Sequence, residues 1–176
     1  NKELDDGMSS TLFKFKANKG RFLTAGETPV PMPPTEIPKR SQDMRGMWAE
    51  NCEWAYGGVG YGGFNGSRVG GGCSCWFTRF KLDYFARSFT PEPMQYSVSV
   101  LDSKGNLITR IGKYGNADST GPKSKVPLGG DEVGFFHPSF VGTHTDHRLF
   151  VSDIGNERIV SIKLDYYVNK IIPITK

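Results

Sequence analysis

The sequence predicts an all-β fold built from four-stranded antiparallel blades, like those of a β-propeller. Three observations lead to this class. Residues 80–115 read as four short strands joined by turns. Parts of this segment recur elsewhere in the chain, and internal repeats define an architecture. The 22 glycines and 11 prolines among 176 residues supply many tight turns, and no long helical periodicity accompanies them.

The segment 80–115 shows its strand pattern most clearly at residues 97–101, where small polar and apolar side chains alternate as in a half-buried strand. A turn at 102–106 follows, in which Gly105 is free to adopt a positive φ, and residues 107–111 form the returning strand. Residues 80–83 and 87–90 supply two more strands. The four strands predict a blade that we assign to residues 73–115.

The central segment aligns with a later part of the chain. When residues 87–90 are aligned with residues 148–151, the alignment continues through the next strand without a gap. We call this alignment of the two segments the repeat alignment. It predicts a second blade at 135–174, because the same alternation reappears there. The strands expected in this blade lie at 139–142, 148–152, 158–164 and 170–174.

The turn and returning strand of the central segment also align with an earlier part of the chain, where 104–109 fall on 19–24. This match predicts a hairpin over residues 12–25, with its turn at 18–20, as a partial blade at 11–25. The whole chain, 1–176, would then be one propeller-like domain with an incomplete ring.

Residues 27–72 are expected to be a long loop. Five prolines in 27–38 prevent ladder hydrogen bonds and favour an extended connection. Glycines and aromatic residues alternate after residue 44, without the Gly-Lys-Ser/Thr of a phosphate-binding loop. Such a loop is either a compact structural element or a ligand-contacting one. The aromatic residues that would contact a ligand are Trp48, Trp54, Tyr56, Tyr61, Phe64 and Trp76.

Three segments near the C-terminus resemble an NHL repeat: 136–138 (Phe-His-Pro), 146–153 (Asp-His-Arg-Leu-Phe-Val-Ser-Asp) and 155–159 (Gly-Asn-Glu-Arg-Ile). Residues 96–115 resemble the second half of such a repeat, whereas 11–25 match only as a hairpin. The resemblance implies a β-propeller. Because a propeller needs about four to eight blades, we expect this chain to be part of a longer propeller or to close one by self-association.

Three cysteines, Cys52, Cys73 and Cys75, allow at most one internal disulfide. The sequence leaves three interpretations open: a disulfide from Cys52 to Cys73 or Cys75, free thiols, or a metal site. The disulfide would anchor the glycine-rich loop. A disulfide, together with the first residue being Asn1 rather than Met, favours an extracytoplasmic location, periplasmic or secreted, unless the chain is a piece of a longer one.

His137 is the residue that we would assign to a metal, zinc or calcium, because it precedes the first strand of a blade and imidazole binds zinc well. Peptidyl-hydroxyglycine lyases, which the chain resembles through its NHL-like repeats, hold zinc with histidines in the propeller channel. His144 and His147 lie in a turn that we expect to face solvent.

The composition narrows the function further. The mean hydropathy is −0.42 and no long apolar run occurs, so no membrane span is expected. The net charge of +4 is spread along the chain, which does not indicate a nucleic-acid surface. We therefore expect an interaction or ligand-binding module for a protein, glycan or small molecule. The alternative is a metal-dependent lyase or hydrolase with His137 among the ligands.

Overall fold

A computed structural model describes residues 10–24, 47–60, 78–119, 123–126 and 133–165. These residues form short strands that assemble into small sheets, and the only helical elements described are single 3₁₀ turns. The prediction of an all-β fold is confirmed. In the described ranges, no helix is long and apolar enough to cross a membrane.

The central sheet has four antiparallel strands in chain order, as the sequence predicts. They are β5 (Lys81–Leu82), β6 (Ser88–Glu92), β7 (Ser97–Leu101) and β8 (Leu107–Ile111). The turn between β7 and β8 is closed by Asp102, whose Oδ1 accepts hydrogen bonds from the backbone N–H of Lys104 and of Asn106, both at 2.8 Å. Gly105 has φ +81°, the left-handed conformation expected for it.

A second antiparallel sheet contains β11 (Pro138–His144), β12 (Arg148–Asp153) and β13 (Arg158–Lys163). Three of the four strands predicted for the last blade are thus present. The fourth, at 170–174, lies outside the described residues.

The two sheets share one connection geometry at equivalent positions of the repeat alignment. In the central sheet, β6 leads through the 3₁₀ turn η3 (Pro93–Gln95) and the left-handed Tyr96 (φ +54°) into β7. In the second sheet, β12 leads through η4 (Ile154–Asn156) and the left-handed Glu157 (φ +50°) into β13. In both cases the strand before the turn ends on a carboxylate that is 0% exposed, Glu92 or Asp153.

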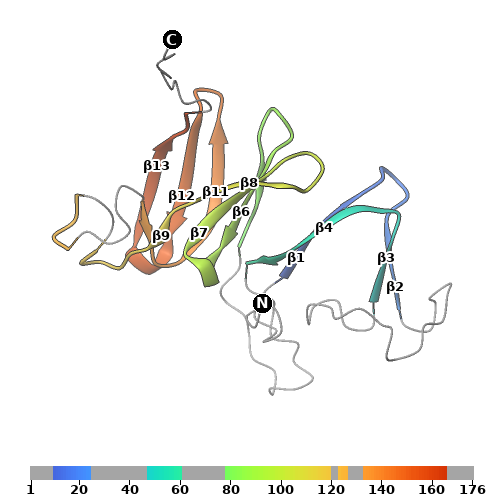
Figure 1. Cartoon of the computed structure of the whole chain (residues 1–176), viewed down its shortest axis with the longest axis horizontal. Helices are drawn as coiled ribbons and strands as arrows, with labels where there is room; N and C mark the ends of the chain where they lie inside the picture. Colours follow the sequence, from blue (N-terminus) through green and yellow to red (C-terminus); the bar gives the residue numbers. More distant parts are fainter. Residues whose placement is uncertain (1–9, 25–46, 61–77, 120–122, 127–132, 166–176) are drawn as a thin grey trace, which may run out of the picture.

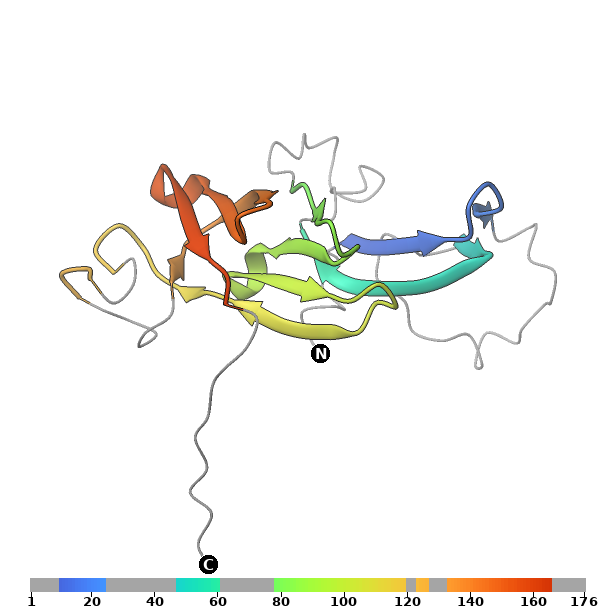
Figure 2. The ribbon, with the colours of Figure 1, turned by 90° about the horizontal axis from the view of Figure 1, so that it is seen from above.

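The hydrophobic core lies between these two sheets (Figures 1 and 2). Burial of such side chains supplies most of the folding free energy. A short parallel pair of β9 (Lys113–Tyr114) and β10 (Gly134–Phe135) places Phe135 in this core. Gly112, just before β9, has φ +97°, and a Cβ there would lie 2.3 Å from the Phe135 ring, so only glycine fits. The buried members are Phe89, Val98, Val100, Phe135, Leu149 and Val151.

The predicted hairpin over residues 12–25 is wrong. β1 (Ser10–Phe15) and β2 (Arg21–Thr24) do not pair with each other; β1 pairs with β4 (Cys52–Val59) and β2 with β3 (Met47–Glu50). The result is one bent two-stranded ribbon (Figure 1). The ribbon bends between the β1–β4 pair and the β2–β3 pair. At this bend Asn51 has φ +57°, and its carbonyl accepts a hydrogen bond from the Lys16 N–H at 3.1 Å.

The prediction of a loop throughout 27–72 is also wrong for residues 47–59, which form β3 and β4. Along β4, partly buried Cys52, Trp54 and Tyr56 alternate with exposed residues, which is the period of two of a strand with one covered face. The glycines that obscured this alternation come at the end of the strand, where Gly58 has φ +95°.

Candidate functional site

Two of the aromatic residues expected to bind a ligand hold the ribbon to the central sheet. The Trp54 Nε1–H donates to the Ser103 carbonyl at 3.1 Å, and the indole lies where a Cβ on Gly105 would stand, 2.6 Å from Cδ2. The Tyr56 hydroxyl donates to Glu92 Oε1 at 2.7 Å. Both side chains are therefore used within the fold.

Tyr56 belongs to a polar network that the sequence did not indicate. Glu92, which is 0% exposed, accepts from Arg110 Nε at 2.7 Å, and Arg110 Nη2 donates to the Tyr56 hydroxyl at 3.0 Å. Burial raises the pKa of Tyr56, and the hydrogen bond to Glu92 raises the pKa of Arg110. The network keeps Tyr56 neutral and Arg110 charged. Its three residues lie on β4, β6 and β8, so its hydrogen bonds hold these three strands together.

Of the other residues predicted to bind a ligand, Trp48 lies on β3 opposite Leu23 and is partly buried. Tyr61, Phe64 and Trp76 lie outside the described residues, and a ligand-binding role for them stays a prediction.

Cys52 carries a free thiol, whose Sγ–H donates to the Trp54 carbonyl at 3.0 Å. Burial raises the pKa of this thiol, which makes it less reactive. Cys73 and Cys75 lie outside the described residues, and the structure has Cys52 as a free thiol and not in the bridge to one of them that the sequence allowed.

His137, the expected metal ligand, is buried with 3% of its surface exposed. Its backbone N–H donates to Asp153 Oδ1 at 2.8 Å. Among the described residues, no group of three His, Cys, Asp or Glu side chains comes close enough together to hold a metal ion. The described part of the chain thus does not complete a set of three protein ligands around this imidazole.

Burial lowers the pKa of His137, although the nearby Asp153 carboxylate acts to raise it. A lowered pKa means that the unfolded chain takes up a proton first as the pH falls, at its ordinary value of about 6.5. The contribution of His137 to stability is therefore complete above that pH and is lost as the pH falls below it.

We expect the free energy of unfolding to decrease between pH 7 and pH 5 more steeply in the natural chain than in His137→Gln. Urea unfolding at a series of pH values measures both slopes. Equal slopes for the two proteins would show that His137 does not contribute to the pH dependence.

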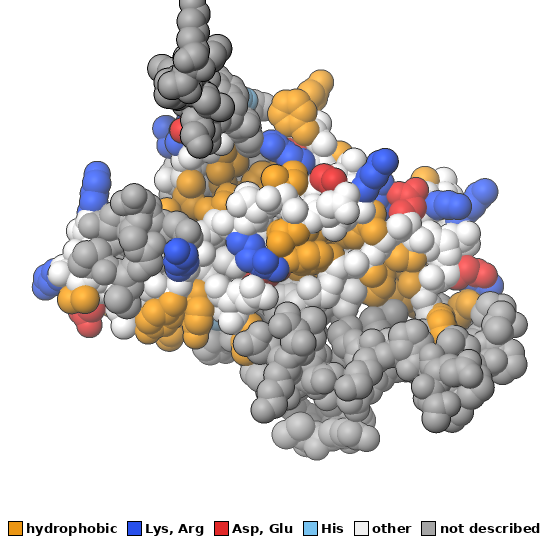
Figure 3. Space-filling view, in the orientation of Figure 1, with side chains coloured by type: hydrophobic (Ala, Val, Ile, Leu, Met, Phe, Trp, Pro, Cys, Tyr) orange, Lys and Arg blue, Asp and Glu red, His pale blue; other side chains and the backbone are white. Residues whose placement is uncertain are grey.

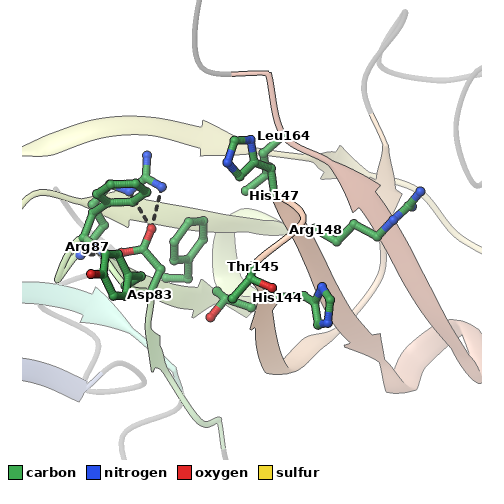
Figure 4. A pocket seen from close by; sticks show the side chains of 11 residues that line it. Asp83, Arg87, His144, Thr145, His147, Arg148 and Leu164 are labelled. Atoms are coloured by element: carbon green, nitrogen blue, oxygen red, sulfur yellow. Dashed lines mark hydrogen bonds and ion pairs between the residues drawn. The ribbon is translucent and has the colours of Figure 1, made fainter.

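A pocket of about 270 Å³ lies between the tips of the two sheets (Figure 4). One wall comes from the turn 83–87 between β5 and β6, and the other from the turn 143–148 between β11 and β12. Phe89 lies in the core below it, and Leu164 follows β13. The Thr143 hydroxyl is 3.4 Å from the Leu82 carbonyl, which ties the two strand ends together.

Asp83 organises the first wall of the pocket. Its Oδ1 accepts from the backbone N–H of Phe85 and of Arg87, both at 2.9 Å, and its Oδ2 accepts from the Arg87 Nε at 2.7 Å. The Arg87 guanidinium lies 5.2 Å from the centre of the Phe85 ring and 5.8 Å from that of Phe89. These are cation–π distances, so Arg87 connects this turn both to Phe85 at the surface and to Phe89 in the core.

The second wall also carries polar and charged groups. His144 Nδ1 is 2.7 Å from Asp146 Oδ1, and Arg148 Nε donates to Asp146 Oδ2 at 3.2 Å. His144, His147 and Arg148 all line the pocket, but the His144 and Arg148 side chains point away from it (Figure 4), and Arg148 Nη1 donates to the Ser161 hydroxyl at 3.1 Å. The sequence placed His144 and His147 in a solvent-facing turn, but it did not indicate that another turn lies beside them.

A signal for this site was present in the sequence. The repeat alignment that matches the strands also places 83–87 on 144–148. Repeats that stack side by side bring equivalent turns together at one edge, and these are the two walls of the pocket.

Comparison with known proteins gives no further assignment. No protein-family model matches the chain, and no curated protein matches it significantly.

Proposed function

We propose that this chain is a β-propeller-like protein-binding module, and that the pocket between the turns 83–87 and 143–148 receives one side chain of the partner. The observation that carries this is the pair of aromatic residues at the pocket. Tyr84 is 93% exposed and Phe85 is 62% exposed, and their rings contact each other edge to face at 5.7 Å. Exposed aromatic residues are enriched in interfaces, and hydrophobic side chains project from the molecule near this turn (Figure 3).

The arrangement of the two sheets supports the propeller-like part of the proposal. Strands, 3₁₀ turns and left-handed residues coincide under the repeat alignment. The sheets pack face to face through one core, as neighbouring blades do. A parallel bridge between Arg79 and Phe140 joins the chain ahead of β5 to β11, the first strand of the second sheet.

The exposed aromatic residues beside the pocket and its lining favour a protein partner. The pocket, at about 270 Å³, is near the lower end of the range for small-molecule sites, about 300–1,000 Å³, and has room for a single large side chain. Phe85, Phe89 and Leu164 make its lining apolar. A pocket that takes one apolar anchor is the usual centre of an interface.

Peptides selected from a random displayed library against the immobilised chain test this proposal. We expect peptides with an aromatic or leucine anchor. Their affinity should fall at least about tenfold with Phe85→Ala, because a hot-spot side chain contributes about 1–2 kcal/mol or more. Ile108→Ala is the matched control, since Ile108 is 55% exposed on β8 and does not line the pocket.

The proposal fails if the selected peptides bind the natural chain and Phe85→Ala equally well, or if no anchored peptide is selected. Enrichment on a glycan array, with no effect of Phe85→Ala on peptides, would indicate a different class of ligand. The metal-dependent lyase gains no support from the described residues, because they do not gather a set of three ligands that includes His137.

A further inference from the structure

Each sheet of this chain has two different faces. In the central sheet, Phe89, Val98 and Val100 point toward the second sheet and form the core with it. The opposite face carries Glu92 and Ser99, which meet Tyr56 of the ribbon. Side chains alternate between the two faces of a sheet along each strand, so the central sheet has one apolar face and one mainly polar face.

The ribbon, the central sheet and the second sheet follow one another in one direction (Figures 1 and 2). The central sheet presents its apolar face to the second sheet. The repeat alignment places Phe89 on Phe150 and Val98 on Ile159. The corresponding face of the second sheet is therefore the one that points away from the core, and it lies at one end of the stack.

This outer face is exposed. Ile159 is 74% exposed, Phe140 is 40% exposed and Phe150 is 38% exposed. They lie in adjacent rows, because Gly142 is paired with Phe150 and Ser152 with Ile159. A Cβ on Gly142, beside Phe150 on the edge strand β11, would meet no atom within 4 Å, so this position of the face is open. Three large exposed apolar side chains on one face indicate a contact surface.

The other end of the stack is the outer face of the ribbon. Lys14 lies on the inner face, because its Nζ donates to the Ser103 carbonyl at 3.1 Å, so its neighbour Phe13 points outward. The Phe13 ring packs edge to face against Phe22 at 5.2 Å, and Phe15 packs against Phe22 at 5.3 Å. Phe22 is 48% exposed. This end is thus also apolar.

We propose that two copies of the chain associate head to tail, with the outer face of β11–β13 in one copy covering the outer face of β1–β4 in the other. The contact repeats the direction in which the layers already stack, from the apolar face of one sheet to the opposite face of the next. Two different surfaces meet, so the contact is heterologous and can continue to a third copy or close into a ring.

Sedimentation equilibrium over a range of concentrations tests this interface. The natural chain should show an average mass that rises above the 19.5 kDa of one chain as its concentration increases. Gly142→Lys places a charge on the outer face beside Phe150 without removing any core side chain, and it should remain at the mass of one chain. Phe13→Glu blocks the other end and should do the same. Ile108→Lys, at an exposed position on β8, should associate like the natural chain.

A mixture of the two blocked variants distinguishes head-to-tail contact from symmetric contact. Gly142→Lys retains its ribbon end and Phe13→Glu retains its sheet end, so an equimolar mixture should form a one-to-one complex and nothing larger. A mass of one chain at every concentration of the natural protein would overturn the proposal, and so would a mixture that stays unassociated. Phe85→Ala should leave association unchanged, so failure of this interface and failure of the peptide-binding pocket are separate results.

Discussion

Replacing Asp153 with alanine is expected to lower the free energy of unfolding by about 3–5 kcal/mol, the usual cost of breaking a buried charged network. The Asp153 carboxylate is 0% exposed. Its Oδ1 accepts from the backbone N–H of His137 at 2.8 Å and of Phe136 at 3.1 Å, while Oδ2 accepts from Asn156 Nδ2 at 2.6 Å. Arg158 Nε lies 3.6 Å from Oδ2.

The loss is large because the carboxylate joins three segments. It connects the chain before β11, the end of β12 and the η4 turn, and Asn156 continues the network to the Gly115 carbonyl at 2.8 Å. Without the carboxylate, buried donors lose their acceptor, and each unsatisfied group costs about 1–3 kcal/mol.

Urea unfolding monitored by circular dichroism measures this effect. Asp102→Ala is the matched control, because Asp102 also accepts from two backbone amides but lies in an exposed turn. We expect a clearly smaller loss for the control. If Asp153→Ala destabilises the chain no more than Asp102→Ala does, the Asp153 network does not hold the second sheet together.

Replacing Glu92 with glutamine is the second large effect, with an expected loss of about 2–3 kcal/mol, somewhat below the usual cost of breaking a buried ion pair. The lower figure applies here because the Arg110 side chain is 39% exposed, so water screens the charge that remains. The loss should be accompanied by faster hydrogen exchange in β4 and β1, since Tyr56 connects the ribbon to this carboxylate.

Tyr56→Phe and the double variant with Glu92→Gln separate the ribbon contact from the ion pair. Tyr56→Phe removes one hydroxyl and should cost about 1 kcal/mol. The double variant should be more stable than the sum of the two single losses predicts, because both changes break the same hydrogen bond. Strictly additive losses, or unchanged exchange in β4, would show that the network does not fasten the ribbon.

The strands of the two stacked sheets were predictable because their signal is local. Alternation at 97–101, the turn at 102–106 and the repeat alignment all come from neighbouring residues. Three of the four predicted strands of the last blade are described, and all four strands of the central sheet. At the turn after β12, Asn156 Nδ2 donates to the Asp153 carboxylate at 2.6 Å, which is again an interaction between residues close in the sequence.

The ribbon could not be predicted from such signals. β1 pairs with β4, so that Phe13 faces Ala55, and the chain between them includes β2 and β3, so no adjacent turn marks the pair. The glycines around residue 58 suggested a loop, although the alternation of Trp54 and Tyr56 with smaller residues was present. Pairing over such distances depends on the surface that covers the strands, here the central sheet, and that surface exists only in the folded chain.

The pocket was missed for a related reason. Its two walls come from turns that are far apart in the sequence and meet only because the sheets stack. The cluster of aromatic residues in the sequence led to the prediction that Trp54 and Tyr56 bind a ligand. The exposed aromatic residues of the pocket, Tyr84 and Phe85, instead appear in the sequence as part of a short turn. Exposure, rather than composition, distinguishes an aromatic residue that binds a partner from one that holds the fold together.

The proposed binding function is tested most directly by an amide NMR titration of the chain with the tightest selected peptide. We expect the largest shift changes to fall on the turns 83–87 and 143–148 and on Leu164, and to disappear in Phe85→Ala. Shift changes concentrated on the ribbon strands β1 and β4, with these two turns unaffected, would contradict it and place the binding surface elsewhere.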